Sequence, residues 1–312
     1  MNRFLVATAA ILPVALVLTP QLRGQNVPNA TGDSVAATPP EESPAVPVRR
    51  QSWVLPEGSL VLNLPSDQTL PKGMLQFLVT HRFRAPVRGS DAHSWYSLDS
   101  GADFGVGFAY SPLEHVEASL YRSGIQDDYE IAAKFSERPG GPESAIGLAL
   151  RVGADDRRDP MIVDANGSLL PDARARTSFF AQGVVTLHLA LDRIEVSAVP
   201  TYSSRTTAQR RAFNVPVHAA VALSRSWNLQ AEYQPPRRGV GGSIATWAAG
   251  LEKVLYRHRF EIVVSNTTVT TIDQRLSGDF AVAQIRQQRS FDNGFRNNDW
   301  HIGFNLVRQF KP

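Results

Sequence analysis

Apolar and polar residues alternate with a period of two through most of the chain after Gly73. In residues 128–136, for example, Ile131 and Phe135 fall on one side and Glu130 and Lys134 on the other. A strand with this alternation separates two different environments. The pattern occurs about twelve times, in residues 74–84, 103–110, 115–123, 128–136, 144–153, 177–189, 193–202, 214–224, 226–234, 242–253, 256–265 and 299–310. The chain is therefore expected to be all-β.

The links between these stretches mostly alternate between short and long, with two exceptions: "GIQDD" (124–128) is short where a long link is expected, and "ERPGGP" (137–142) stands where a short one is expected. Short links such as "SPLE" (111–114) and "ALD" (190–192) alternate with long ones, of which residues 266–298 are the longest. Short turns at one end and long loops at the other are typical of an outer-membrane β-barrel. An even number of strands places both chain termini at the short-turn end, which is normally periplasmic.

The length of the stretches favours the same architecture. Most span 8 to 13 residues, whereas strands of soluble proteins usually have about five or six and membrane strands about 9 to 11. We therefore predict an antiparallel transmembrane β-barrel of about 12 strands. A periplasmic β-sandwich or a lipocalin-like barrel is the alternative, because alternation alone does not say whether the apolar side faces lipid or a protein core.

The N-terminus has the pattern of an export signal. Asn2 and Arg3 precede the apolar run "FLVATAAILPVALVL" (4–18), which is short for a membrane span. We expect residues 1–24 to be a signal peptide, with a retained anchor helix as the alternative. Residues 25–50 have the composition of a disordered Pro-rich tether. Residues 51–73 are expected to form an extended lead-in segment docked on a barrel of residues 74–312.

Charge and cysteine content narrow the classes of function. The net charge is only +3, which argues against a nucleic-acid-binding surface. The chain has no cysteine, so disulfides, thiolate metal sites and a cysteine nucleophile are excluded.

Three segments resemble a known family. They are "LPSDQTLPKGMLQFLVTHRFR" (64–84), "LYRSGIQDDYEIAAKF" (120–135) and "NDWHIGFNLVRQF" (298–310). They are similar to an uncharacterised family of bacterial outer-membrane β-barrels, a domain of unknown function, over about residues 60–310. The resemblance implies an outer-membrane-type barrel and supplies no catalytic residue. Lys311 and Pro312 depart from the pattern of barrels that end on an aromatic residue.

Neither metal nor catalytic motifs stand out. The seven histidines lie on different predicted strands and loops without HxH or HExxH spacing, so no metal or cofactor is expected. The nearest Ser–His pairs are His93 with Ser94 and His218 with Ser224, and neither lies in a GxSxG motif. A barrel lipid hydrolase is therefore the least favoured of three functional hypotheses.

Polar residues on the alternate faces of the strands are candidates for the lining of a lumen. These lumen-lining candidates are Glu130, Lys134, Arg151, His188, Glu195, His218, Glu232, Arg257, Arg259, Glu261, His301 and Asn305. A second group lies in two basic loops at the long-loop end, where arginines suit anions or the phosphates of lipopolysaccharide. These anion candidates are Arg205, Arg210, Arg211, Arg237 and Arg238.

The leading functional hypothesis is a channel or solute-uptake protein with a polar lumen, in the outer membrane of a Gram-negative bacterium. The alternative is a structural or accessory barrel with a filled interior, which binds a periplasmic protein through residues 26–72. The expected partners are outer-membrane lipid and lipopolysaccharide, with a small solute if the lumen conducts.

Overall fold

The computed structural model describes most of the chain after residue 58. The described residues are 59–88, 90–93, 95–141, 143–158, 161–163, 169–171, 176–206, 211–236, 245–277 and 300–311. The expected signal peptide (1–24) and tether (25–50) lie outside this range, as does most of the loop before the last strand.

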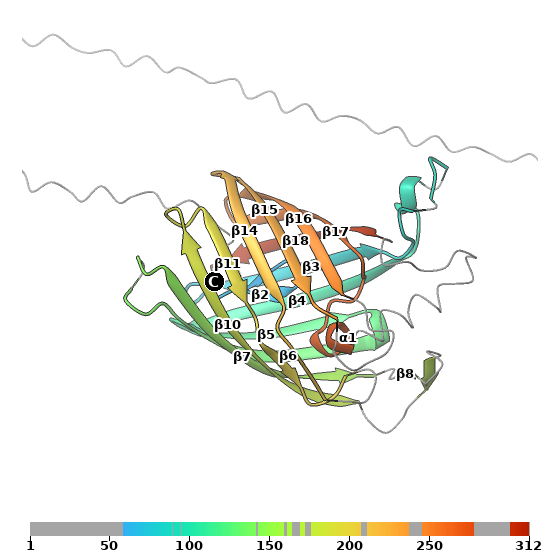
Figure 1. The fold of residues 1–312 in the computed structure, drawn as a ribbon, viewed down its shortest axis with the longest axis horizontal. Coiled ribbons are helices and arrows are strands. Elements are labelled where there is room, and N and C mark those ends of the chain that lie inside the picture. The colour runs from blue at the N-terminus through green and yellow to red at the C-terminus, as the bar shows by residue number, and fades with distance from the viewer. Residues whose placement is uncertain are drawn as a thin grey trace, which may run out of the picture. The chain divides into compact units, whose positions relative to one another are not determined.

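The described chain is dominated by one closed antiparallel β-barrel of 12 strands (Figure 1). Two of the twelve are interrupted, so β11 with β12 counts as one strand and β13 with β14 as another. The barrel strands are β3 (Leu75–Phe83), β4 (Ala102–Leu113), β5 (Val116–Ser123), β6 (Asp128–Glu137), β7 (Ile146–Arg157), β10 (Thr177–Leu189), β11 (Ile194–Ala198), β12 (Thr201–Ser203), β13 (Ala212–Asn214), β14 (Val217–Ser224), β15 (Trp227–Gln234), β16 (Thr246–Leu255), β17 (His258–Ser265) and β18 (His301–Phe310).

This architecture confirms the predicted antiparallel barrel of about 12 strands. The two interruptions have a local cause: Pro200 lies between β11 and β12, and Pro216 between β13 and β14. Proline has no N–H group to donate to a neighbouring strand, so the regular ladder stops there. Other strands run past their predicted ends, since β4 continues to Leu113 and β7 to Arg157.

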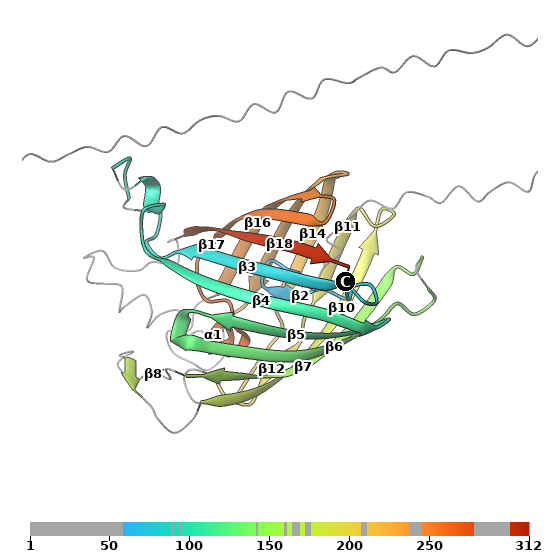
Figure 2. The same cartoon turned by 180° about the vertical axis from the view of Figure 1, so that it is seen from behind.

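The ring closes where the first and last barrel strands meet. β18 pairs antiparallel with β3, with Leu306 opposite Val79 and Asn305 opposite Thr80. Figure 2 shows the two strands side by side. Inside this seam, Arg82 Nη1 of β3 donates a hydrogen bond of 2.8 Å to Asn305 Oδ1 of β18. The seam is therefore joined by side chains as well as by the strand ladder.

The two faces of the wall differ as the alternation predicts. Large apolar side chains point outward, including Ile131 and Phe179, which are 61% and 64% exposed. Their neighbours Glu130 and Ser178 point inward and are buried. An apolar outer band with polar residues inside is the arrangement of a barrel in a membrane.

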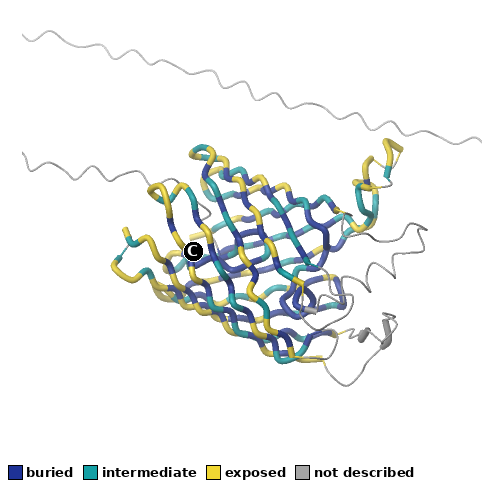
Figure 3. Tube along the Cα trace, viewed as in Figure 1, coloured by how far each residue is buried: buried dark blue, intermediate teal, exposed yellow. Residues whose placement is uncertain are grey.

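The remaining elements are short. They are β1 (Leu60–Val61), β2 (Leu64–Pro65), β8 (Met161–Val163), β9 (Leu169–Pro171), the 3-10 turns η1 (Trp95–Ser97) and η2 (Ile125–Asp127), and α1 (Ile272–Ser277). No helix among the described residues is long and apolar enough to cross a membrane. β1 and β2 pair as a small hairpin, with Val61 opposite Leu64. Figure 3 shows buried chain inside the ring, where this hairpin and α1 lie.

Candidate functional site

Two segments that are not barrel strands occupy the lumen. The lumen hairpin, residues 59–73, contains β1 and β2 and directly precedes β3. The loop insert, residues 266–277, follows β17 and contains α1. Both are largely buried, and both contact polar side chains of the inner wall. The candidate site is therefore the part of the interior where these two segments contact the wall.

A cross-strand ion pair holds the two ends of the lumen hairpin. Glu117 of β5 lies opposite Lys134 of β6, with 3.8 Å between carboxylate and ammonium. Glu117 accepts hydrogen bonds from the Ser59 hydroxyl and, at 3.0 Å, from the Leu70 N–H. Lys134 donates to the main-chain oxygens of Ser59, at 3.0 Å, and Gln68. Because the Glu117 and Lys134 side chains are both buried, each charge depends on the hairpin for its remaining partners.

A second ionic contact fixes the middle of the hairpin. Asp67 Oδ2 accepts a hydrogen bond of 2.8 Å from His188 Nε2 of β10. Burial raises the pKa of Asp67, but the hydrogen bond and the charge of His188 outweigh it and leave that pKa below its ordinary value. Gly147 of β7 makes room for this pair, since a Cβ there would lie 1.7 Å from Asp67 Oδ2.

The tip of the hairpin is where the two inserts meet. Asn63 Nδ2 donates to Glu232 Oε1 of β15 at 2.7 Å. Arg275 of the loop insert donates to the same carboxylate oxygen and to the Asn63 carbonyl oxygen, each at 3.0 Å. Beside this polar group, Leu62 packs against Ala248 and Val263 of the wall.

The loop insert also contacts the inner wall of the barrel, beside β3 and β5. The Thr270 hydroxyl lies 2.8 Å from the Tyr121 hydroxyl, which lies 2.7 Å from that of Thr80. Ile272 and Leu276 of α1 pack in an apolar cluster with Ala132, Phe180 and Ala212. Polar and apolar contacts together fasten α1 to the wall.

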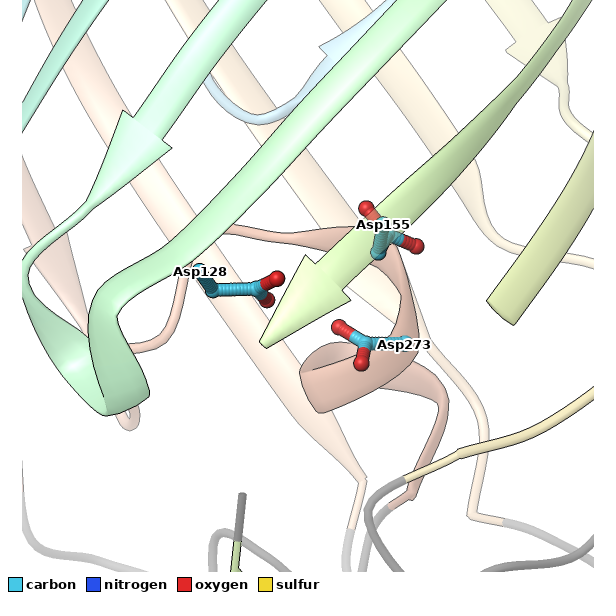
Figure 4. A group of neighbouring side chains, drawn as sticks. All are labelled: Asp128, Asp155 and Asp273. Carbon is cyan, nitrogen blue, oxygen red and sulfur yellow. The ribbon is translucent and has the colours of Figure 1, made fainter. Parts of the chain in front are cut away.

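Three buried aspartates face one another beside α1. Asp128 begins β6, Asp155 lies near the end of β7, and Asp273 lies in α1. Figure 4 shows the three side chains gathered near the end of β7, with the carboxylates of Asp128 and Asp273 directed toward one another. One carboxylate oxygen of each aspartate lies within 4.8 Å of the others. Arg157 Nε lies 3.0 Å from Asp273 Oδ2. Burial raises the pKa of Asp273 above its ordinary value, although Arg157 opposes the shift.

Little space remains between these groups. A cavity between the hairpin, β3 and β5 has a volume of about 40 Å³, and another near Glu252 has about 10 Å³. Such volumes suit a few water molecules. The described residues therefore leave these cavities too small for a metabolite.

Eleven of the twelve lumen-lining candidates have buried side chains on inward-facing positions of the wall. They are Glu130, Lys134, Arg151, His188, Glu195, His218, Glu232, Arg259, Glu261, His301 and Asn305. Arg257 does not line the lumen: it lies in the turn between β16 and β17 and packs on the ring of Tyr256. The alternation was counted through this turn, where the strand geometry is broken.

Several of these candidates pair with one another. Arg151 bonds to Glu130 and, at 3.0 Å, to Gln182 Oε1. Asn305 Nδ2 donates to Glu261 Oε2 at 2.6 Å. His218 Nδ1 lies 3.9 Å from Glu195 Oε1, so the structure brings His218 to a carboxylate. Ser224, the serine that the sequence pairs with His218, lies at the far end of β14.

Sequence reasoning missed other members of the site. Glu252 accepts a hydrogen bond of 2.5 Å from Arg259, and Arg82 reaches Asn63 at 3.3 Å. Both occupy inward positions of predicted strands, so a stricter count of the alternation finds them. Asp155 lay beyond the predicted end of its strand, and nothing in the spacing connects it with Asp273.

Two of the five anion candidates lie among the described residues. Arg205 is half-buried and donates to the Thr177 carbonyl oxygen at 3.4 Å, while Arg211 is exposed. Arg210, Arg237 and Arg238 lie outside the described residues.

Comparison with known proteins places the chain in a family. The model of the family described as "Membrane bound beta barrel domain (DUF5777)" matches residues 57–310. No curated protein matches the sequence.

Two solved structures show distant similarity. Outer membrane phospholipase A from Escherichia coli has 10% identity and a TM-score of 0.42, covering 75% of this chain and 89% of that one. The Acinetobacter baumannii outer membrane protein Omp33 has 7% identity and a TM-score of 0.37, covering 76% and 98%. We base no functional inference on either.

Proposed function

Because this chain belongs to the family of membrane bound beta barrel domains, we propose that it acts in the bacterial outer membrane as a closed accessory barrel. The observation that supports this role is the occupation of the lumen by the hairpin of residues 59–73. Glu117, Lys134 and Glu232 are buried, and each forms a hydrogen bond with that hairpin in addition to its ion pair. An open pore has no need of such partners, because water would solvate the same charges.

The position where the hairpin enters supports a periplasmic partner. Ser59 contacts Glu117, the second residue of β5, just after the tight turn from β4. The start of β3, the end of β18 and the tight turn between β4 and β5 share this end of the barrel, which is periplasmic in outer-membrane barrels. The described chain therefore begins, at Ser59, beside the wall at the end proposed to be periplasmic, and we propose that the segment before it recruits a soluble protein there.

Planar-bilayer recording of the refolded full-length protein tests the closed state. We expect no conductance steps at voltages that leave the membrane intact. Stable steps from the wild-type protein would show that the filled interior is not its resting state, and would overturn the proposal.

A cross-linker placed before the hairpin tests the periplasmic partner. A photoreactive residue at Ser43 is expected to give one discrete adduct in cells, whereas the same residue at Arg211, at the long-loop end, gives none of that mass. Equal adduct patterns at both sites, or none at Ser43, would contradict recruitment through this segment.

A gated channel is the second candidate, and one observation favours it. The hairpin is a single continuous segment held largely by hydrogen bonds and ion pairs, which water can replace if the segment leaves. Since the chain has no cysteine, a Ser66→Cys variant reports on this motion. Ser66 is 1% exposed, so its thiol is protected in a closed barrel and reacts steadily with a water-soluble thiol reagent in a gated one. Tyr256→Cys, in an exposed turn, is the reactive control.

A further inference from the structure

The three aspartates beside α1 come from three separate elements. Asp128 and Asp155 belong to neighbouring strands of the wall, and Asp273 belongs to the loop insert. All three are 0% exposed. The three side chains lie together near the end of β7 (Figure 4), with one carboxylate oxygen of each within 4.8 Å of the others.

Among the residues that the structure describes, the charge of this cluster is not balanced by its neighbours. Three ionised carboxylates carry a formal charge of −3, and Arg157 supplies +1 through its ion pair with Asp273. The next inward residue of the wall toward the hairpin, Glu130, is already paired with Arg151. The formal deficit of two charges is the charge of one divalent cation.

The hydrogen bonds of the carboxylates leave two oxygens available to bind a cation. Thr271 Oγ1 and Gln274 Nε2 donate to Asp128 Oδ2, at 2.7 and 3.1 Å. Ser178 Oγ donates to Asp155 Oδ2 at 3.3 Å. Asp128 Oδ1 and Asp155 Oδ1 have no hydrogen-bond donor among the described residues, although both side chains are fully buried. A buried carboxylate oxygen without a donor is costly, and a cation at the shared space would supply its partner.

The donor atoms select the kind of cation. Carboxylate oxygens without nitrogen or sulfur suit hard ions such as Ca²⁺ and Mg²⁺. Calcium binds oxygen at about 2.3–2.6 Å, so two of its ligands lie up to about 5 Å apart, whereas the limit for Mg²⁺ is about 4.2 Å. The three oxygens lie within 4.8 Å of one another, which is inside the limit for calcium, and calcium is therefore the ion we test.

We infer that Asp128, Asp155 and Asp273 form a calcium site that ties the loop insert to the barrel wall. Two of the ligands are in the wall and the third is in α1, so the bound ion joins elements that no strand ladder connects. The inference is independent of whether the barrel conducts.

Calcium titration of the full-length protein tests the site. The protein is refolded into detergent without lipopolysaccharide, stripped with EDTA, and titrated with CaCl₂ by calorimetry. We expect saturable binding of one ion per chain, and a rise in the melting temperature on adding calcium. Absence of saturable binding to the wild-type protein would overturn the inference without recourse to any variant.

A matched pair of variants locates the ion. Asp155→Asn is expected to weaken calcium binding at least tenfold. Asp156→Asn changes the adjacent residue of β7, which lies on the other face of the strand, and is expected to bind as the wild type does. Heat-modifiable gel mobility confirms that both variants fold. Binding that survives Asp155→Asn, or is lost equally in Asp156→Asn, would place the ion elsewhere and contradict the site.

Discussion

Asn63 and Arg275 are 212 residues apart in sequence, yet Arg275 Nη1 donates a hydrogen bond of 3.0 Å to the Asn63 carbonyl oxygen. The first residue lies at the tip of the lumen hairpin and the second in the loop insert. The two inserts therefore contact each other inside the barrel, with Glu232 bound to both. This contact makes the filling of the lumen one connected unit rather than two independent plugs.

Removal of Arg275 is expected to destabilise the barrel strongly. Arg275→Ala leaves the buried Glu232 carboxylate without its cationic partner, which typically costs about 3–5 kcal/mol. The free energy of unfolding in urea, measured on refolded protein, gives the loss. Arg122→Ala is the matched control, because its ion pair with Asp127 is exposed and worth about 1 kcal/mol or less. Equal losses in the two variants would mean that Arg275 does not act through a buried pair.

A methyl group at Gly147 is expected to loosen the lumen hairpin. Its Cβ would lie 1.7 Å from Asp67 Oδ2, so Gly147→Ala forces Asp67 away from His188 at a cost of about 1–3 kcal/mol. Hydrogen exchange of residues 59–73, followed by mass spectrometry, is expected to speed up. Gly183→Ala, on the neighbouring strand, would place its Cβ an ordinary 3.4 Å from Pro200 and should leave exchange unchanged. Slow exchange in both variants would contradict the docking of Asp67 beside Gly147.

Acid is expected to weaken the contact between Asp67 and His188. A carboxyl group whose pKa is lowered on folding adds stability that is complete above its ordinary value of 3.8 and is lost as the pH falls through the lower, folded value. The free energy of unfolding of the wild type should therefore exceed that of Asp67→Asn by about 1–3 kcal/mol near pH 6. This difference should shrink as the pH falls below 3.8.

An exposed carboxylate provides the comparison for this acid effect. Asp99→Asn changes a loop residue on the surface and should alter the free energy of unfolding by no more than about 0.5 kcal/mol. A difference for Asp67→Asn that stays constant down to pH 2, or grows, would show that the ionised carboxylate does not hold the hairpin.

A charge on the outer wall tests the orientation toward lipid. Ile131 lies in the middle of β6 and is 61% exposed, while Leu113 ends β4 beside the tight turn and is 57% exposed. Ile131→Arg is expected to cost about 2–4 kcal/mol in lipid, and Leu113→Arg about 1 kcal/mol or less, because the penalty falls toward the membrane surface. Refolding into lipid vesicles at increasing urea measures both. Equal penalties would contradict the placement of β6 across the bilayer core.

The alternation of residues predicted the barrel because each strand has an apolar face directed outward and a polar face directed into the lumen. Residues 177–189 became β10 without a change at either end, and the even count of twelve matched the closed ring. The same rule placed Glu130 and Asn305 inside. It failed at Arg257, where the count ran through a turn, and β4 ran past Tyr110 because the strand continues through a register shift.

The alternation of residues did not predict the contacts made inside the lumen. Residues 59–73 are expected from sequence to be extended, but nothing in their order says that Asp67 meets His188 or that Leu70 meets Glu117. These partners are brought together only by closure of the ring. The aspartate cluster is even harder to predict from the sequence. Asp273 belongs to a long link between strands, about which the alternation of residues says nothing. Contacts that depend on topology are therefore the part that the sequence alone does not provide.

The seam between β3 and β18 has a consequence for how the molecule comes apart. The side chains of Arg82 and Asn305 are hydrogen-bonded across this seam. Both also contact the hairpin tip, Arg82 at Asn63 Oδ1 and Asn305 at the Leu62 carbonyl oxygen. A ring of paired strands opens most readily where the two chain ends meet, since only there can one ladder break without unthreading a loop. Here the side chains along that ladder also bind the lumen hairpin, which directly precedes β3 in the chain. Lateral opening must therefore extract the hairpin in the same step, which raises the barrier to unfolding even where the equilibrium stability is modest.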